Sequence, residues 1–520
     1  MNRYRWAALV LLGLLVVSLS AAFERVPGYM DAEYYTAIGM RLASGEGFSE
    51  PFIWNYLDDP SAIPHPSNLY WMPLPSMLAA GGMLLFGDGW RAAQLPFILL
   101  GGLLPVLTAF VALRITHDDR TAWLAGLLAV FPGFFLPYLS TVDSFAIYAV
   151  LGSLILLLLA KTDMDWRASF LAGLMIALAH LTRADGIVFF LPAGAAILSV
   201  KTGRLRRLVF LACGYLLGIA PWWVRNLQVL GTLMPNTSTA FWFTAYNDLF
   251  AFPADQINFQ RWLASGWAAI LEARLDALIV NSQRVVAEIG MVLLFPFSLV
   301  GGWSLRKTRL IWLSGLYFIG VFGLMTVIFP FAGANGGMFH SGAALLPVVL
   351  SLAPVGIERI VTLVSERRKW RQGEAVRVFQ GAAVTMMFVL TMWITAGKLG
   401  TSPLGGNWSS THAEYQRYGR TLAAYGLAER TGAVNNPPGY FLANGGETVV
   451  IPDGDVSTLQ QVVQRYDVAW VLLEANHPPA LADLYRQPDS LPWLERLATV
   501  EDSAGLPVYL YAVIDEGMEP

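Results

Sequence analysis

Long apolar runs alternate with short polar turns over the first 400 residues, and this pattern ends there. A helix that crosses a bilayer needs about 17–25 apolar residues, and eleven runs come near that length. The pattern therefore predicts an α-helical polytopic membrane protein. The predicted spans are 6–23, 93–113, 121–137, 144–160, 168–182, 186–200, 208–224, 285–304, 310–330, 342–363 and 378–397.

One further apolar run, 73–86, falls short of the hydrocarbon core, and the distribution of lysine and arginine decides whether it crosses. At a rise of about 1.5 Å per residue its 14 residues reach only about 21 Å, and the hydrocarbon core is about 30 Å thick. We expect an interfacial helix that lies along the membrane surface.

Lysine and arginine orient the predicted spans, because cytoplasmic turns are enriched in them. If 73–86 does not cross, every dense basic turn falls on one side, together with Arg3 and Arg5. The N-terminus is then cytoplasmic and the C-terminal end is external. The basic turns are 114–120, 161–167, 201–207, 306–309 and 365–377.

Three segments then lie outside, at 24–92, 225–284 and 399–520. The last alternates strand-like pieces such as "TVVIP" with helix-like pieces such as "DVSTLQQVVQRY", which predicts a small α/β domain. We therefore divide the chain into a transmembrane domain, 1–398, and an extracytoplasmic α/β domain, 399–520.

Composition agrees with a membrane protein. The chain is 55% hydrophobic and 14% charged, with a mean hydropathy of +0.51, whereas a soluble domain carries about 25% charged residues. A cleaved signal peptide is an alternative for the first run, but the many later runs favour an uncleaved first span. No basic tract suggests nucleic acid.

The first external segment opens with "VPGYMDAEYY", which places two carboxylates, Asp31 and Glu33, beside Tyr35. Asp31 is either the N-cap of a helix or a general base at the membrane face. Glu33 shares a face with Asp31 only if this stretch is extended. A D-x-E pair can bind a divalent metal, so the metal requirement stays open. Tyr35 is a substrate-binding candidate.

Other candidates lie near the predicted external ends of the spans. His65, between prolines, is more readily structural than catalytic. Asp143 is either the N-cap of the span at Ser144 or a functional acid, since an ionisable group at this depth is costly. For Arg183 we prefer a local contact with Asp185.

Two further side chains emerge at the same predicted face. Arg225, in "PWWVRN", is either an interfacial anchor or a ligand for a lipid phosphate, which guanidinium binds bidentately. His340, in "GGMFHSG", either binds a phosphate or sugar hydroxyl or is satisfied by the backbone. Because no acid or base stands clearly in mid-span, the pattern disfavours a solute transporter.

Together these stretches resemble the GT-C superfamily of membrane glycosyltransferases. The resemblance covers nearly the whole chain. It is to the branch that contains the protein O-mannosyltransferases, the lipid A aminoarabinose transferase and the bacterial lipopolysaccharide glycosyltransferases. It rests on the order of "GYMDAEYY", "STVDSF", "LTRADG" and "PWWVRNLQVLGTLMPN". The C-terminal domain differs from that of the mannosyltransferases, so their specific activity is not implied.

The resemblance implies transfer of a sugar from a polyprenyl-phosphate donor to an extracytoplasmic acceptor, a glycan, lipid or protein, at a bacterial inner membrane. It implies that Asp31 and Asp143 are catalytic acids, that Glu33 accompanies Asp31, and that Arg225 contacts the donor phosphate. His340 has no family counterpart. The alternatives are a lipid-linked sugar transporter or flippase, a membrane sensor, and a non-catalytic envelope scaffold.

Overall fold

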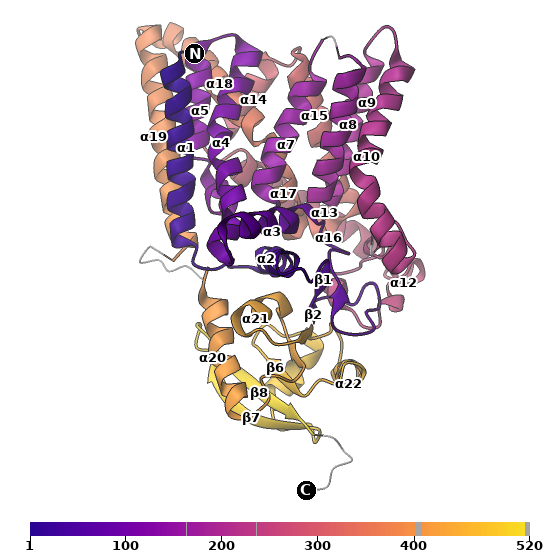
Figure 1. Cartoon of the computed structure of the whole chain (residues 1–520). Coiled ribbons are helices and arrows are strands. Elements are labelled where there is room, and N and C mark those ends of the chain that lie inside the picture. The colour runs from indigo at the N-terminus through magenta and orange to yellow at the C-terminus, as the bar shows by residue number, and fades with distance from the viewer. Residues whose placement is uncertain (163, 236, 401–407, 515–520) are drawn as a thin grey trace.

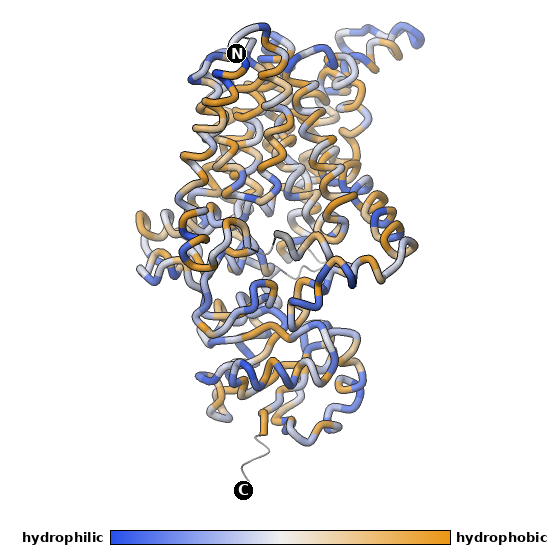
Figure 2. The backbone as a smooth tube through the Cα atoms, turned by 90° about the vertical axis from the view of Figure 1, so that its right-hand side faces the viewer, coloured by the Kyte–Doolittle hydropathy of each residue, from blue (hydrophilic) through white to orange (hydrophobic). Residues whose placement is uncertain are grey.

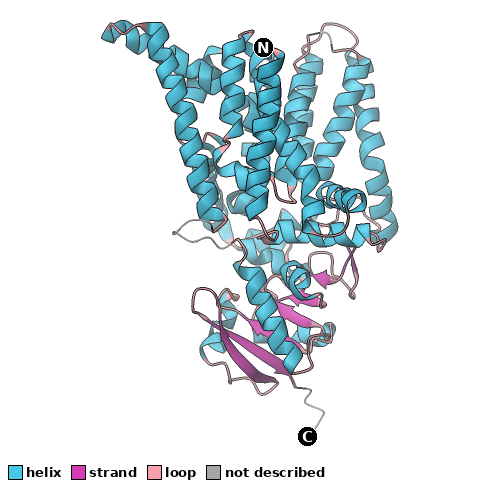
Figure 3. Cartoon of the chain, turned by 60° about the vertical axis from the view of Figure 1, so that its left-hand side comes forward, coloured by secondary structure: helices cyan, strands magenta, loops and turns pink. Residues whose placement is uncertain are grey.

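The computed structural model describes residues 1–162, 164–235, 237–400 and 408–514. A helical bundle holds the N-terminus at its far end, and a smaller domain that contains the strands lies at the opposite end (Figures 1 and 3). Hydrophobic residues dominate the bundle, while polar residues are frequent in the smaller domain (Figure 2). The predicted architecture, a helical membrane domain with an α/β domain at its C-terminal end, is confirmed.

Among the described residues, six helices are long and apolar enough to cross a bilayer, or seven if one bent pair is a single span. The bent pair joins α5 (Asp119–Val130) to the helical segment Gly133–Leu139 at 46°. Shorter apolar helices are α3 (Leu74–Phe86), α7 (Ser144–Leu159), α8 (Trp166–Thr182) and Ala184–Leu198, so the count of eleven spans stays a prediction. The six are α1 (Arg3–Phe23), α4 (Trp90–Thr116), α10 (Arg204–Leu230), Arg309–Ile328, Pro330–Arg368 and α19 (Gln372–Lys398).

The prediction of one continuous helix over 285–304 is wrong. Helix α13 (Gly266–Arg284) runs into a single π-turn, Val285–Ile289, and α14 (Phe295–Ser304) begins only after a break. Met291 and Val292 within the break adopt positive φ angles of 53° and 48°. Pro296 in the first turn of α14 starts a new helix without needing a backbone donor.

Helix α3 matches the short run predicted to lie in the interface. It crosses the end of the bundle beside α2 (Met30–Ala43), between the bundle and the C-terminal domain (Figure 1). Leu84 and Leu85 are 69% and 78% exposed, which suits a surface that faces lipid.

The basic turns meet at the end of the bundle that holds the N-terminus. There the N-terminal amino group pairs with Asp119. Further contacts join the turns, namely Arg120 to Gln380, Arg207 to the carbonyl of Met164, and Arg309 to the carbonyl of Leu159. The sequence correctly grouped these turns on one side, opposite the C-terminal domain.

The C-terminal domain contains a six-stranded sheet in the order β2-β5-β4-β6-β8-β7. Strands β5, β4 and β6 are parallel, and β8 and β7 are antiparallel. The bounds are β4 (Gly432–Val434), β5 (Thr448–Val450), β6 (Trp470–Leu473), β7 (Leu494–Glu501) and β8 (Pro507–Val513), with helices α20 (Ser410–Ala424), α21 (Pro437–Asn444), α22 (Val456–Arg465) and α23 (Ala482–Arg486).

The sheet also takes in β2 (Phe52–Ile53) from the first outer segment, which pairs in parallel with β5. Next to it, Tyr466 Oη donates to the carbonyl of Pro60 at 2.7 Å. The second outer segment contributes the carbonyl of Phe250, which accepts from Asp453 N at 2.9 Å. The sheet therefore crosses the predicted boundary at 398/399, and residues 401–407 beside that boundary lie outside the described residues.

Candidate active site

Three ionisable side chains from separate elements meet where the bundle faces the C-terminal domain. Asp31 comes from α2, Asp143 stands before α7, and His340 comes from α17 (Met338–Gly342). His340 Nδ1 lies 3.7 Å from Asp143 Oδ1, and His340 Nε2 lies 3.9 Å from Asp31 Oδ2. The chain thus brings together groups that are more than 300 positions apart at the extremes.

The N-cap prediction for Asp31 is wrong. Helix α2 begins at Met30, and its N-cap is Tyr29, which has extended backbone and makes no side-chain cap bond. Asp31 therefore lies within the first turn, where a carboxylate interacts favourably with the helix dipole. Burial and the neighbouring charge of Asp143 raise the pKa of Asp31 to about 7, although 33% of its side chain stays exposed.

Asp143 is almost fully buried and is the N-cap of α7, as one of the two sequence interpretations held. Its carboxylate accepts from the backbone N–H of Ser144 and, at 2.6 Å, from Tyr29 Oη. Burial raises its pKa, while these hydrogen bonds and the charge of Arg183 oppose the rise. Asp143 is thus held in a fixed orientation beside Asp31.

Arg183 supplies positive charge to this pair. Its Nε lies 2.9 Å from Asp185 Oδ1, which confirms the expected local contact. Its charge nevertheless lowers the pKa of both Asp31 and Asp143, so it also belongs to their electrostatic environment. Tyr35, one turn after Asp31, is buried, and both carboxylates contribute to raising its pKa.

His340 reaches the site because the chain breaks just before α17. Asn335 and Gly336 leave helical geometry, and Gly336 has a φ of +113°. The imidazole stacks on Phe145 with ring centroids 4.0 Å apart, and its Nδ1 lies 3.0 Å from Ser144 Oγ. The sequence had left its role open, and the structure aims both ring nitrogens at polar side chains.

Glu33 does not face Asp31. Because α2 is helical here, side chains two residues apart point to different faces. Glu33 Oε2 accepts from Asn436 Nδ2 of the C-terminal domain at 2.7 Å, and burial raises the pKa of Glu33 to about 7. A metal site built on Asp31 and Glu33 therefore does not form.

His65 and Arg225 line a separate cavity of about 380 Å³ with Phe48, Ser49, Pro64, Pro66 and Val229. His65 Nε2 lies 2.8 Å from Asp58 and its Nδ1 lies 3.3 Å from Glu50. Burial opposes the charged form, but these two acids outweigh it and raise the pKa of His65 to about 9. This pairing agrees with the structural interpretation of His65.

Arg225 donates from Nη2 to the carbonyl of Phe48 at 3.1 Å and lies over the ring of Trp222 at 4.8 Å. It has no carboxylate partner among the ion pairs of the described residues. Its guanidinium is therefore available to an anion in this second cavity.

Sequence reasoning missed two residues that act on members of this cluster, one on Asp143 and one on His340. Tyr29 donates to Asp143, and its only signal was its place two residues before Asp31. Arg284, whose charge acts on His340, pairs with Glu288 at 2.9 Å and donates to the carbonyl of Ala334. It could have been noticed as a lone cation at the edge of the run 285–304.

The same three residues could hold a divalent cation. Asp31, Asp143 and His340 each offer one ligand atom, and these atoms all lie within 4.8 Å of one another. A mixed set of carboxylate and imidazole ligands suits Mn²⁺ or Zn²⁺ better than Mg²⁺.

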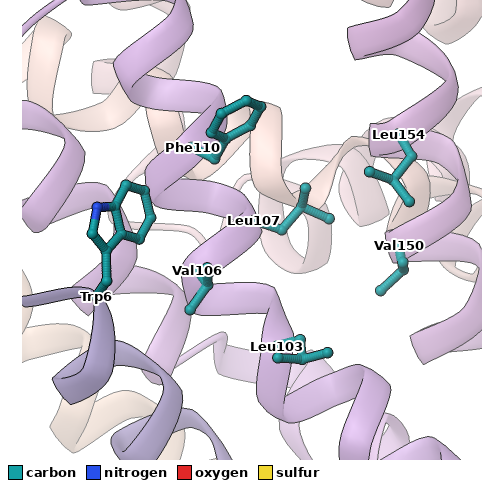
Figure 4. Close-up of a pocket in the computed structure, with 7 residues that line it drawn as sticks. All are labelled: Trp6, Leu103, Val106, Leu107, Phe110, Val150 and Leu154. Carbon is teal, nitrogen blue, oxygen red and sulfur yellow. The ribbon is translucent and has the colours of Figure 1, made fainter. Parts of the chain in front are cut away.

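Another cavity, of about 470 Å³, lies between α1, α4 and α7 and opens on the outer surface of the bundle, where Leu103 and Phe110 are exposed. Its lining is wholly apolar, as Figure 4 shows: Trp6, Leu103, Val106, Leu107, Phe110, Val150 and Leu154. Such a lining suits hydrocarbon and offers no ionisable side chain.

Comparisons with known proteins agree with this architecture. Residues 65–224 match the family model of dolichyl-phosphate-mannose-protein mannosyltransferases, a match that includes Asp143 but not Asp31. The crystal structure of ArnT from Cupriavidus metallidurans bound to undecaprenyl phosphate aligns over 100% of both chains, with a TM-score of 0.59 and 14% identity.

The apo structure of the same ArnT aligns over 96% of this chain and 97% of its own, with a TM-score of 0.55 and 13% identity. No curated protein sequence matches the chain. The family match and the aligned structures agree on one architecture, and the chain therefore has the fold of the GT-C superfamily of membrane glycosyltransferases.

Proposed function

We propose that this protein transfers a sugar from a polyprenyl-phosphate donor to an acceptor outside the cytoplasm, with inversion at the anomeric carbon. The observation that carries the proposal is the meeting of Asp31, Asp143 and His340 at the bundle end that faces the C-terminal domain. A structure of the same fold is described as bound to undecaprenyl phosphate, which supports a polyprenyl-linked donor.

In this mechanism Asp31 is the general base. It is partly exposed and its pKa is about 7, close to the ideal for a base at neutral pH. It takes the proton of the acceptor hydroxyl while that oxygen attacks C1 of the sugar. The bond from C1 to the phosphate oxygen breaks, and prenyl phosphate leaves with the electron pair.

The leaving group needs no acid, because a phosphate leaves as a stable anion that cations can stabilise. Arg183 and Arg284 supply positive charge next to the carboxylates and His340. Asp143, fixed by Tyr29 and Ser144, orients the acceptor or the sugar. Tyr35 and His340 contact the sugar.

Arg225 holds the lipid phosphate as it approaches from the membrane. At about 1.5 Å per residue, Arg225 lies about 31 Å along α10 from the basic end at Arg204. This distance is close to the ~30 Å thickness of the hydrocarbon core, which supports a position for the guanidinium at the opposite headgroup level. Its cavity is therefore a suitable entrance for a lipid headgroup.

The same membrane geometry gives the localisation. With the basic turns and the N-terminus in the cytoplasm, the carboxylates and the C-terminal domain face the outside of a bacterial inner membrane. The acceptor there is a glycan, a lipid or a protein.

The test is the Asp31→Asn variant, reconstituted in liposomes with a labelled prenyl-phosphate sugar and candidate envelope acceptors. We expect transfer to fall by roughly 10²–10⁴-fold, the usual contribution of a general base. Glu46→Gln is the matched control, because Glu46 is an exposed acid just beyond α2. Undiminished transfer by Asp31→Asn would exclude Asp31 as the general base.

The assay also separates the enzyme from a flippase or a scaffold. A transferase releases free prenyl phosphate only when the acceptor is present. A flippase moves the intact donor between leaflets without releasing it, and a scaffold does neither.

A further inference from the structure

The C-terminal domain contacts the chain on both sides of Asp31. On one side is Trp408, two residues before α20. Its Nε1 donates to the carbonyl of Val26 at 2.9 Å, and its ring meets Tyr29 edge-on with centroids 5.7 Å apart. Since Tyr29 Oη donates to Asp143 Oδ2 at 2.6 Å, a direct line of contacts runs from the C-terminal domain to a buried carboxylate of the site.

A glycine makes this contact close. Gly28 has a φ of +87°, and a Cβ atom there would lie 2.5 Å from the ring of Trp408. No side chain fits between the indole and the backbone before α2. The ring of Trp408 therefore packs directly against the backbone at Gly28, which has no side chain.

The other contact lies two residues beyond Asp31. Glu33, which is 2% exposed, accepts from Asn436 at the start of α21. A Cβ atom at Gly439 would lie 2.9 Å from Glu33 Oε2, so glycine again allows the approach. The parallel pairing of β2 with β5 fixes the C-terminal domain against the first outer segment. The contacts of Trp408 and Asn436 therefore come from a domain that is held in place by its sheet.

We propose that Trp408 and Asn436 are positioning residues of the transfer site: the C-terminal domain holds Tyr29 on Asp143 and α2 at a fixed angle, and so aims Asp31. This inference rests on the proposed function and deepens it. The domain is then an integral part of the catalytic unit and not a separate acceptor-binding module.

The experiment compares Trp408→Ala and Trp408→Phe in the full chain. For Trp408→Ala we expect kcat to fall by at least about tenfold, since small misplacements of reacting groups are costly, with the donor KM changed by less than about threefold. Trp408→Phe keeps a ring against Tyr29 and restores most of the rate.

Trp393→Ala is the matched control, because Trp393 lies on α19 and is 62% exposed. If Trp408→Ala does not accumulate in the membrane, Tyr29→Phe replaces it, since this change removes only the hydroxyl that donates to Asp143. A wild-type kcat in these variants would overturn the proposal.

Amide hydrogen exchange decides the positioning role without any transfer assay. We expect residues 26–43 to exchange faster in Trp408→Ala and in Asn436→Ala than in the wild type. Unchanged exchange overturns the inference even if the chain transfers sugar. Faster exchange supports it even if the proposed donor is wrong, so the two failures are distinguishable.

Discussion

The pH dependence of transfer tests the base directly. If Asp31 must be ionised, kcat/KM rises with pH and levels off above the pKa of about 7. The ionised fraction is about one half at pH 7, about a tenth at pH 6 and about one hundredth at pH 5. We therefore expect the rate constant to fall about tenfold per unit below pH 7. Because Asp31 and Asp143 interact, the acid limb of the pH–rate profile reports an apparent pKa that belongs to the pair.

The assay is initial-rate transfer from a prenyl-phosphate sugar in liposomes between pH 5 and 9. The donor is a phosphodiester and does not titrate in this range, so a limb near pH 7 belongs to the protein. EDTA is added in one arm, because a divalent cation held by Asp31, Asp143 and His340 would stabilise the carboxylates and move the limb toward acid.

Glu33→Gln is the decisive control, because burial also raises the pKa of Glu33 to about 7. If the ionisation of Asp31 causes the acid limb of the pH–rate profile, that limb should remain in Glu33→Gln. A profile that is flat between pH 5 and 8, or a limb that disappears with Glu33, would refute the assignment of Asp31 as the base.

Two further predictions concern the contacts around the site. Gly28→Ala and Gly45→Ala impose the same left-handed backbone on alanine, with φ angles of +87° and +84°, but only Gly28 faces an indole ring. We expect the melting temperature to fall further for Gly28→Ala, and equal losses would show that Trp408 contributes nothing to docking. Arg225→Lys keeps the charge but loses the planar fork that matches phosphate, so the donor KM should rise about five- to tenfold with kcat retained. An unchanged KM would remove Arg225 from the donor path.

Local signals in the sequence carried much of the architecture. The short run 73–86 was predicted as a helix from its apolar pattern, and the density of Lys and Arg sorted the basic turns to one end of the bundle. Asp143 could be read as an N-cap because the apolar run of α7 starts directly after it. Each of these inferences depends on neighbours within a few residues.

The missed features depend on contacts between distant segments. Helix α2 begins two residues earlier than an N-cap at Asp31 would place it, because its N-cap is Tyr29, which packs against Tyr138 and Trp408. Strand β2 has only two residues, too few for any periodic pattern. Glu33 faces Asn436, which lies 403 positions away, so its partner could not be read from spacing. The break after Ile289 escaped notice because the residues on both sides are apolar.

The pairing of β2 with β5 also sets an order of assembly during synthesis. Tyr56, three residues after β2, donates to the carbonyl of Val450, which the ribosome adds 394 positions later. At about 5–20 residues per second, the first outer segment waits roughly 20–80 s for its partner strand. Trp408 and Asn436 arrive only near the end of that interval. The nascent chain thus holds Asp31, Asp143 and His340 before Trp408 and Asn436 are made, and the first outer segment gains its contacts with the C-terminal domain only near the end of synthesis.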